Sequence, residues 1–270
     1  MSRMARLIDI TRCTGCRGCQ VACKRWNELE GEIDAFTGSY QSHSDLSPNR
    51  WTMIKFYEEK KPTGFEWHFR KTTCLHCGDA ACVRVCPNGA LIQTENGTVR
   101  RIEEKCVGCG YCAKACPFDI PKVDHTAKKM RKCSFCYDRI TNGLTPACAK
   151  TCVPQAIVYG SWDDMAKLAD ERLALAKGRY PKAQIYGKTE LGGLGVIYVL
   201  PDSPANYGLP IDPKISFELV FWKEVVQPAG KLLIGASLAA TAAAFIISRR
   251  NAFKQKPSSK IEEGGGQDHE

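Results

Sequence analysis

The sequence predicts an α+β protein in which two small cysteine-rich modules are nested and a single transmembrane helix follows near the C-terminus. Three observations support this prediction. Sixteen of the 270 residues are cysteine, and all of them fall into four runs of four. Segments rich in aromatic and β-branched residues separate some of these runs, which is typical of short strands. An uncharged stretch, residues 232–248, lies close to the C-terminus.

The third cysteine run has the spacing of bacterial ferredoxins. Cys106, Cys109, Cys112 and Cys116 follow the pattern C-x2-C-x2-C-x3-C, and Pro117 comes next. This pattern binds a [4Fe–4S] cluster through its first three cysteines, whereas the fourth cysteine ligates a neighbouring cluster. We therefore expect paired runs to hold clusters close enough for electron transfer, and each module to be a two-cluster, ferredoxin-like unit.

The other three runs depart from this pattern in small ways. They consist of Cys13, Cys16, Cys19 and Cys23; of Cys74, Cys77, Cys82 and Cys86; and of Cys133, Cys136, Cys148 and Cys152. Lys24 replaces the expected proline after the first run, and the second and fourth runs have longer loops between their second and third cysteines. Because a longer loop still reaches a cluster, we expect all sixteen cysteines to be ligands of four [4Fe–4S] clusters.

Disulfides and zinc are the competing explanations for so many cysteines. Disulfide frameworks are typical of short secreted chains, and residues 1–10 contain no apolar run of signal-peptide length. Zinc sites use paired C-x2-C motifs separated by a spacer. A membrane-anchored zinc scaffold protein is therefore the weaker alternative, and colour, iron and acid-labile sulfide distinguish it from an iron–sulfur protein.

The net charge of +9 does not indicate a nucleic-acid partner. An oxidised cluster with four thiolates carries about −2, so four clusters bring the charge to about +1. No motif for binding RNA or DNA accompanies the basic residues. Most lysines and arginines beside the runs, including Lys114 and Lys132, are expected to form a solvated basic face.

The order of the runs predicts how they pair. Runs two and three are neighbours, and Asn96-Gly97 between residues 90–94 and 98–102 is a type I′ hairpin signal. They form the predicted inner module, so runs one and four form the outer one. Four ligand sets follow: Cys13, Cys16, Cys19 with Cys152; Cys133, Cys136, Cys148 with Cys23; Cys74, Cys77, Cys82 with Cys116; and Cys106, Cys109, Cys112 with Cys86. The alternative pairs run one with two and run three with four.

The remaining segments complete the predicted organisation. Aromatic and β-branched residues predict strands at 51–57 and 65–70. Ser161 is a good N-cap for a helix that ends at Gly178, and strands are expected at 156–159 and 196–200. The predicted divisions are 1–30 with 125–160 (outer module), 31–73 (β-rich insertion), 74–124 (inner module), 161–226 (α/β extension and connecting segment), 227–250 (transmembrane helix) and 251–270 (polar tail).

The C-terminal segment is long enough to cross a bilayer. A helix over residues 228–249 is about 33 Å long, against a hydrocarbon core of about 30 Å. Basic residues gather after it, at Arg249, Arg250, Lys254, Lys256 and Lys260. Since basic residues favour the cytoplasmic side, we expect a bacterial inner-membrane protein with a cytoplasmic tail and a periplasmic cluster domain. This arrangement requires export in the folded state, carried by a partner with a twin-arginine signal.

The chain resembles the iron–sulfur (beta) subunit of respiratory, membrane-bound formate dehydrogenase. The cysteine runs alone are shared with a wider superfamily, whereas Trp26-Asn27 and the single C-terminal span narrow the resemblance to formate dehydrogenase. Run three is intact, unlike that of nitrate reductase beta subunits. The resemblance covers nearly the whole chain, with motifs at Asp9–Cys16, Cys23–Asn27, Arg70–Cys77, Cys106–Pro121, Pro146–Cys152, Tyr198–Leu200, Gly208–Pro210 and Phe221–Lys223.

The resemblance implies that this chain transfers electrons between two other subunits. A separate alpha subunit with a molybdenum or tungsten bis-pterin centre oxidises formate, and electrons pass through this chain to a b-type haem in a gamma membrane subunit and on to quinone. It also supports the pairing of run one with four and two with three, with run one near the alpha subunit and run three near the haem. No catalytic dyad, triad or nucleotide loop stands out, so we expect no catalysis on this chain. The alternative partners are a hydrogenase or a sulfur-compound reductase.

Overall fold

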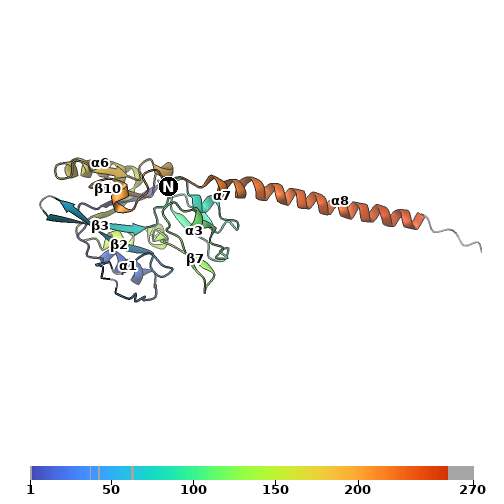
Figure 1. Ribbon diagram of the computed structural model, residues 1–270, viewed down its shortest axis with the longest axis horizontal. Helices are drawn as coiled ribbons and strands as arrows, with labels where there is room; N and C mark the ends of the chain where they lie inside the picture. Colours follow the sequence, from blue (N-terminus) through green and yellow to red (C-terminus); the bar gives the residue numbers. More distant parts are fainter. Residues whose placement is uncertain (1, 37, 42, 62–63, 255–270) are drawn as a thin grey trace, which may run out of the picture. The chain divides into compact units, whose positions relative to one another are not determined.

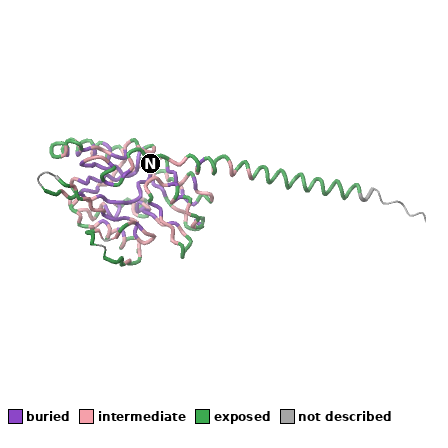
Figure 2. The backbone as a smooth tube through the Cα atoms, in the orientation of Figure 1, coloured by how far each residue is buried: buried purple, intermediate pink, exposed green. Residues whose placement is uncertain are grey.

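The computed structural model describes residues 2–36, 38–41, 43–61 and 64–254. It divides into two compact units, Met1–Val220 and Phe221–Glu270, which we describe separately. The first unit combines short strands with short helices, and buried strands form its interior (Figures 1 and 2). The α+β class is confirmed.

A four-stranded sheet lies at the centre of the first unit. Its strand order is β8 (Ile157–Ser161), β1 (Met4–Asp9), β10 (Val196–Leu200) and β9 (Gln184–Tyr186). β1 runs parallel to β10, and the two outer strands run antiparallel to their neighbours. All five residues of β10 are buried, which explains its unbroken apolar sequence.

Only some strands of this sheet were predicted from the sequence. β8 and β10 are confirmed, whereas β1 and β9 were not predicted. The sheet also joins strands from the predicted outer module to strands from the 161–226 extension. The division at residue 160 therefore separates strands that share one sheet, and the predicted domain boundaries stay a proposal.

Helix α6 (Trp162–Lys177) covers one face of the sheet beside β10 (Figure 1). The Asp164 N–H donates to the Ser161 hydroxyl (3.1 Å), so the predicted N-cap is confirmed. Gly178 follows the last helical residue as predicted, but its backbone is right-handed (φ −61°, ψ −33°). The Tyr180 N–H bonds to the Ala176 carbonyl, so the chain continues turning and needs no left-handed stop here.

The strands predicted at 51–57 and 65–70 are present, as is the hairpin predicted between runs two and three. β2 (Thr52–Lys61) pairs with β3 (Gly64–Thr73), and β4 (Leu91–Gln93) pairs with β5 (Val99–Arg101), both antiparallel. A third hairpin, β6 (Lys122–Asp124) with β7 (Lys129–Arg131), was not predicted.

The type I′ turn predicted at Asn96-Gly97 is wrong. Such a turn needs positive φ at both residues, but only Gly97 has it (φ 79°). The Gly97 N–H donates to Thr94 O and the Thr94 N–H to Thr98 O, which makes a three-residue loop. The Asn96 side-chain oxygen accepts from the Thr94 and Thr98 hydroxyls (2.6 and 3.0 Å), and these bonds stabilise the longer loop.

The cysteine runs themselves form loops that lead into short helices. Cys19 and Cys23 lie on α1, Cys82 on α2, Cys112 on α3 and Cys148 on α5. The helices are α1 (Gly18–Trp26), α2 (Ala81–Arg84), α3 (Tyr111–Ala115), α4 (Tyr137–Thr141) and α5 (Ala147–Lys150), with 3-10 turns η1 (Glu190–Gly192) and η2 (Pro204–Tyr207).

Replacing Gly78 with alanine is expected to lower the free energy of unfolding by about 1–3 kcal/mol. A β-carbon there would lie 2.8 Å from the Gly192 carbonyl carbon and closer still to its oxygen. The loop after Cys77 would have to move away from the turn at residues 191–193, to which it is hydrogen-bonded. Thermal unfolding followed by circular dichroism measures the effect. Gly31→Ala is the control, because no atom lies within 4 Å of that added carbon, and equal midpoints for both variants would contradict the prediction.

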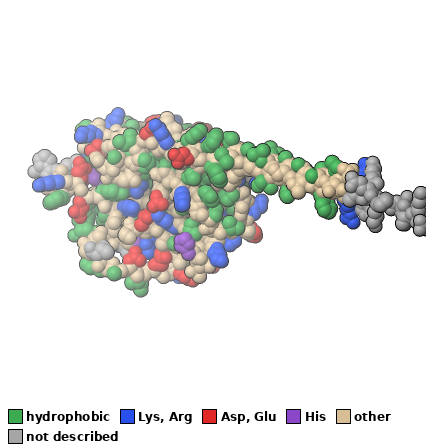
Figure 3. Space-filling model, turned by 45° about the vertical axis from the view of Figure 1, so that its right-hand side comes forward, with side chains coloured by type: hydrophobic (Ala, Val, Ile, Leu, Met, Phe, Trp, Pro, Cys, Tyr) green, Lys and Arg blue, Asp and Glu red, His purple; other side chains and the backbone are tan. Residues whose placement is uncertain are grey.

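The second unit is dominated by one long helix. α7 (Phe217–Phe221) and the π-helical turn η3 (Trp222–Val226) lead into α8 (Gln227–Lys254). Within Phe217–Asn251, the most apolar window of 18 residues has a mean hydropathy of 1.8, and none of that window is buried (Figure 2). Basic side chains gather near the C-terminal end of α8, not along its apolar middle (Figure 3).

This helix is long and apolar enough to cross a membrane. It contains the predicted transmembrane segment 227–250. Residues 255–270 of the predicted polar tail, including Lys256 and Lys260, lie outside the described residues.

Candidate iron–sulfur cluster sites

All sixteen cysteines are described, and none of them forms a disulfide. Fourteen are buried or partly buried, while Cys16 and Cys109 are exposed. Free thiols that are mostly buried in groups are expected of metal or cluster ligands, not of a disulfide framework.

The outer runs bring their cysteines together in two groups. Burial, followed by repulsion from Cys152 and Cys16, raises the pKa of Cys13. Burial raises the pKa of Cys19 to about 12, and Cys152 is again among its electrostatic neighbours. The first three cysteines of run one therefore lie near the last cysteine of run four.

The reciprocal group contains the last cysteine of run one. Burial raises the pKa of Cys23, and the neighbouring thiols that raise it further are Cys133, Cys148 and Cys136. Cys23 thus lies among the first three cysteines of run four, as the predicted crossing of ligands requires.

The inner runs repeat the arrangement. The pKa of Cys77 is raised by burial and by its neighbours Cys74, Cys116 and Cys82. Burial raises the pKa of Cys112 to about 12, with Cys109, Cys86 and Cys106 as its thiol neighbours. Cys86, Cys106, Cys109 and Cys112 also line one cavity.

Contacts between the groups give them an order. Cys19 and Cys148 are electrostatic neighbours across the outer pair. Cys82 and Cys112 are neighbours across the inner pair. Cys133 of the outer module belongs to the same packed cluster of side chains as Cys74 of the inner module. The groups therefore follow one another in a line, from the group of Cys13 to the group of Cys106.

The surroundings of the sulfurs fit [4Fe–4S] clusters. Backbone amides donate to Sγ atoms in all four groups: Ala90 N–H to Cys86 (3.2 Å), Met130 N–H to Cys106 (3.4 Å), Phe135 N–H to Cys133 (3.3 Å), Ile157 N–H to Cys152 (3.3 Å), and the amides of Ile120 and Phe118 to Cys116. Hydrogen bonds to the sulfurs stabilise a negatively charged cluster and tune its potential. Each group offers four thiols, which is the number of protein ligands that a [4Fe–4S] cluster takes.

Local backbone geometry explains two residues beside the runs. Gly108 has φ 68°, and a β-carbon there would lie 2.6 Å from the Lys128 carbonyl carbon, so the loop of run three requires glycine. The Asn27 side-chain amide donates to the Cys23 carbonyl (2.8 Å) and lies 3.6 Å from its Sγ. Asn27 thus holds the end of α1 and the last cysteine of run one together.

Comparison with known proteins identifies the family. Two family models, both described as 4Fe-4S dicluster domain, match residues 12–90 and 65–162. The iron–sulfur subunit of the nitrate-inducible formate dehydrogenase of Escherichia coli (strain K12) is 41% identical over 251 residues, which are 91% of this chain and 84% of that relative. The formate dehydrogenase-O iron–sulfur subunit of the same organism is 42% identical over 243 residues, which are 88% of this chain and 81% of that relative. The chain belongs to the formate dehydrogenase iron–sulfur subunits.

A formate dehydrogenase iron–sulfur subunit is an electron-transfer component and not the catalytic one. This subunit binds [4Fe–4S] clusters through dicluster domains. The B subunit of the anaerobic dimethyl sulfoxide reductase of Escherichia coli (strain K12) is also similar, at 34% identity over 175 residues, 63% of this chain and 78% of that relative.

Several buried cations lie beside the cysteines of the subunit. Lys132 is 7% exposed, and its ammonium donates to the carbonyls of Val99 (2.6 Å) and Cys133 (3.1 Å). It was expected on a solvated face, which is wrong because β7 leads it into the interior. Arg6 and Lys71 were not singled out: Arg6 precedes Cys13 and Lys71 precedes Cys74 in sequence, but the cysteines beside Arg6 belong to run four and those beside Lys71 to runs one and four. An arginine inside the apolar segment Met4–Asp9 was the available signal.

These cations change the acidity of one thiol in particular. Burial acts to raise the pKa of Cys133, but Arg6 and Lys71 together lower it to about 7. The thiolate form, which is the form that ligates metal, is therefore favoured at this position.

His76, which lies between two cysteines of run two, has a structural position. It is 1% exposed, and its Nδ1 accepts a hydrogen bond from the Val99 N–H (3.0 Å). Its ring packs edge-on against Phe135, with centroids 4.8 Å apart. Burial lowers the pKa of His76 well below its usual value, so the ring is neutral. The ring therefore links the loop of run two to β5.

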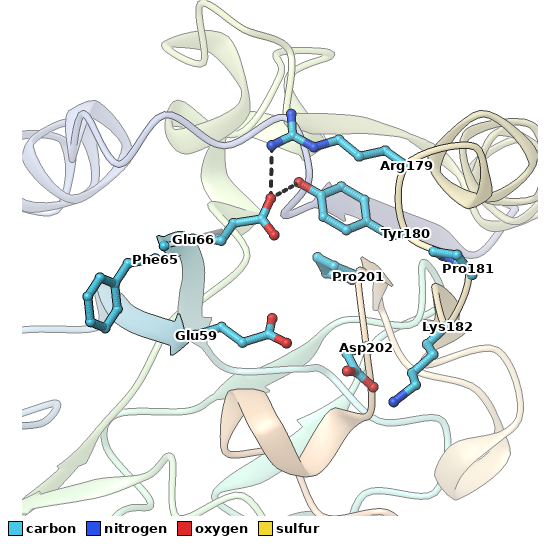
Figure 4. Close-up of a pocket in the computed structure, with 10 residues that line it drawn as sticks. Glu59, Phe65, Glu66, Arg179, Tyr180, Pro181, Lys182, Pro201 and Asp202 are labelled. Carbon is cyan, nitrogen blue, oxygen red and sulfur yellow. Dashed lines mark hydrogen bonds and ion pairs between the residues drawn. The ribbon is translucent and has the colours of Figure 1, made fainter. Parts of the chain in front are cut away.

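A separate polar pocket lies at the outer part of the β2–β3 hairpin (Figure 4). Ligand atoms of Glu59, Glu66 and His68 lie within 4.8 Å of one another, as they would around a metal ion. The Glu66 carboxylate, however, already accepts from Tyr180 (2.7 Å) and pairs with Arg179 (2.9 Å). These partners satisfy its charge, so the three side chains are better explained as a link between the hairpin and the turn after α6.

Proposed function

We propose that this subunit relays electrons from a formate-oxidising catalytic subunit to a membrane cytochrome. The donor is an alpha subunit with a molybdenum or tungsten bis-pterin centre. The acceptor is a b-type haem in a gamma subunit, which passes electrons to quinone. The names and similarity of the relatives support this proposal, because they are iron–sulfur subunits of formate dehydrogenases.

Four [4Fe–4S] clusters are proposed as the carriers, each held by one of the four cysteine groups. The single observation that carries this proposal is the position of the last cysteine of each run, among the first three cysteines of its partner run. When bound, each cluster accepts and donates one electron. The cysteines hold the clusters in sequence, and the surrounding apolar side chains exclude water between them.

Exposure at the two ends of the line supports entry and exit of electrons there. Cys16 belongs to the first group and Cys109 to the last, and these are the two exposed cysteines. The four cysteines of the group of Cys133 are buried, and those of the group of Cys74 are buried or partly buried. We assign the end near Cys16 to the catalytic subunit and the end near Cys109 to the haem subunit.

The proposed location is the bacterial inner membrane, with α8 as a single span. The basic residues after the span favour a cytoplasmic C-terminus, and the cluster domain then faces the periplasm. Protease treatment of intact spheroplasts tests this. Cleavage of the cluster domain from outside supports the proposal, and cleavage only after the membrane is broken contradicts it.

Formate is expected to reduce the clusters of the gently solubilised complex. EPR spectra at low temperature, recorded after anaerobic addition of formate, measure this. Reduced-cluster signals support both the carriers and the partner. Signals with dithionite but none with formate would exclude the formate-oxidising partner and favour another one, such as the sulfoxide reductase type suggested by the 34% identical relative. The absence of EPR signals with both formate and dithionite would contradict the proposal that iron–sulfur clusters carry the electrons.

A further inference from the structure

Two cations are buried in the core of the outer module without a carboxylate partner. Arg6 on β1 and Lys71 on β3 are each 1% exposed. Among the residues that the structure describes, their charged neighbours are cysteines and each other, with no aspartate or glutamate. A buried cation without a counter-ion costs several kcal/mol. Something in this core must therefore supply negative charge.

Arg6 points at one cysteine group only. Its Nη1 lies 3.2 Å from the Sγ of Cys148 and its Nη2 lies 3.8 Å from the Sγ of Cys133. The guanidinium carbon lies 4.3 Å from the centre of the Phe135 ring, which covers it on one side. Its charge is thus directed to the group formed by the first three cysteines of run four and Cys23.

Lys71 lies between two groups. Its ammonium donates to the Thr52 hydroxyl across the β2–β3 hairpin. Its electrostatic neighbours include Cys148 and Cys23 of one group and Cys19 of the other. The Lys71 carbonyl accepts from the Tyr198 hydroxyl (2.7 Å), which anchors this part of β3 on the central sheet. The lysine is therefore held in place by contacts on both sides of its strand.

We propose that Lys71 sets the reduction potentials of both outer clusters, and that Arg6 sets the potential of one of them. The inference rests on the proposed ligand sets. Reduction adds one negative charge to a cluster, and a fixed positive charge in a poorly solvated interior stabilises that reduced form. Lys71 favours the reduced form of both outer clusters, whereas Arg6 favours that of the cluster held by Cys23 and run four. The inner pair has a different cation, Lys132, near Cys82.

Lys71→Met in the assembled complex tests the shared role, because methionine keeps the length of the side chain and removes the charge. EPR-monitored redox titration is expected to show two of the four clusters about tenfold harder to reduce, which is about 59 mV for one electron. The other two clusters keep their potentials. Lys71→Arg, which keeps the charge, is expected to leave all four near their original values.

Arg6→Gln tests whether Arg6 sets the potential of one cluster only. Glutamine removes the charge and keeps an N–H donor for the cysteine sulfurs. It is expected to shift one cluster only, and that cluster is one of the two that Lys71→Met shifts. Four unchanged potentials in either variant with full iron content would overturn the inference, as would an equal shift of all four. If Lys71→Met fails to bind clusters, an unshifted Arg6→Gln titration is sufficient to overturn it. A wild-type complex without four [4Fe–4S] clusters would instead contradict the proposed function.

Discussion

Replacing Cys23 with alanine is expected to abolish the [4Fe–4S] signal of one site, the one proposed for the first three cysteines of run four. Cys23 belongs to run one in sequence, but its thiol neighbours are Cys133, Cys136 and Cys148. Loss of one of four thiolate ligands removes the charge and the bond that hold one corner of the cluster. Iron content and EPR spectra of the purified complex measure the loss.

Double variants identify the affected site without assigning any spectrum. Cys23→Ala combined with Cys133→Ala is expected to lose one cluster, because both residues serve the same site. Cys23→Ala combined with Cys74→Ala is expected to lose two. The reverse result, with one cluster lost in the second combination and two in the first, would establish the alternative pairing of run one with run two.

A chain that ends at Val226 is expected to leave the membrane fraction when it is produced without its membrane partner. The shortened chain lacks α8, which carries the uncharged stretch 232–248 and is exposed along its described side chains. Fractionation followed by immunoblotting measures the distribution. The cluster domain is expected to keep its iron, since residues 1–220 form a compact unit.

Single substitutions in the full-length chain provide the matched comparison. Ala240→Arg places a charge near the middle of the span and is expected to disfavour insertion by about 2.5–3.5 kcal/mol. Ala240→Leu keeps the segment apolar and is expected to leave the chain in the membrane. If the chain that ends at Val226 stays membrane-bound in the absence of a partner, α8 is not the anchor.

The sequence by itself determined the chemistry of this protein. Cysteine spacing is a local property, since the first three ligands of each proposed cluster come from one run, so the runs could be recognised without any fold. The same holds for the Ser161 cap and for the unbroken apolar strand Val196–Leu200. The crossing of the last cysteines was also predicted from spacing, and the neighbours of Cys23 support it.

Short-range patterns were less informative where contacts decide the conformation. Asn96-Gly97 indicated a two-residue turn, but hydrogen bonds from two threonine hydroxyls to the Asn96 side chain favour a longer loop. Gly178 suggested a left-handed helix end, yet the chain continues in a right-handed turn. In both places, hydrogen bonds between residues two to four positions apart in the sequence decide the turn, and the presence of a glycine does not.

Only the tertiary structure decided which charges surround the cysteines. β1 lies between β8 and β10, strands that follow it by more than a hundred residues, and this pairing carries Arg6 to the cysteines of run four. The β2–β3 hairpin does the same for Lys71. The sequence around a lone arginine or lysine in a strand does not tell which cysteines its charge will lie beside. The electrostatic effect of that charge depends on burial and distance, and both are set by long-range packing.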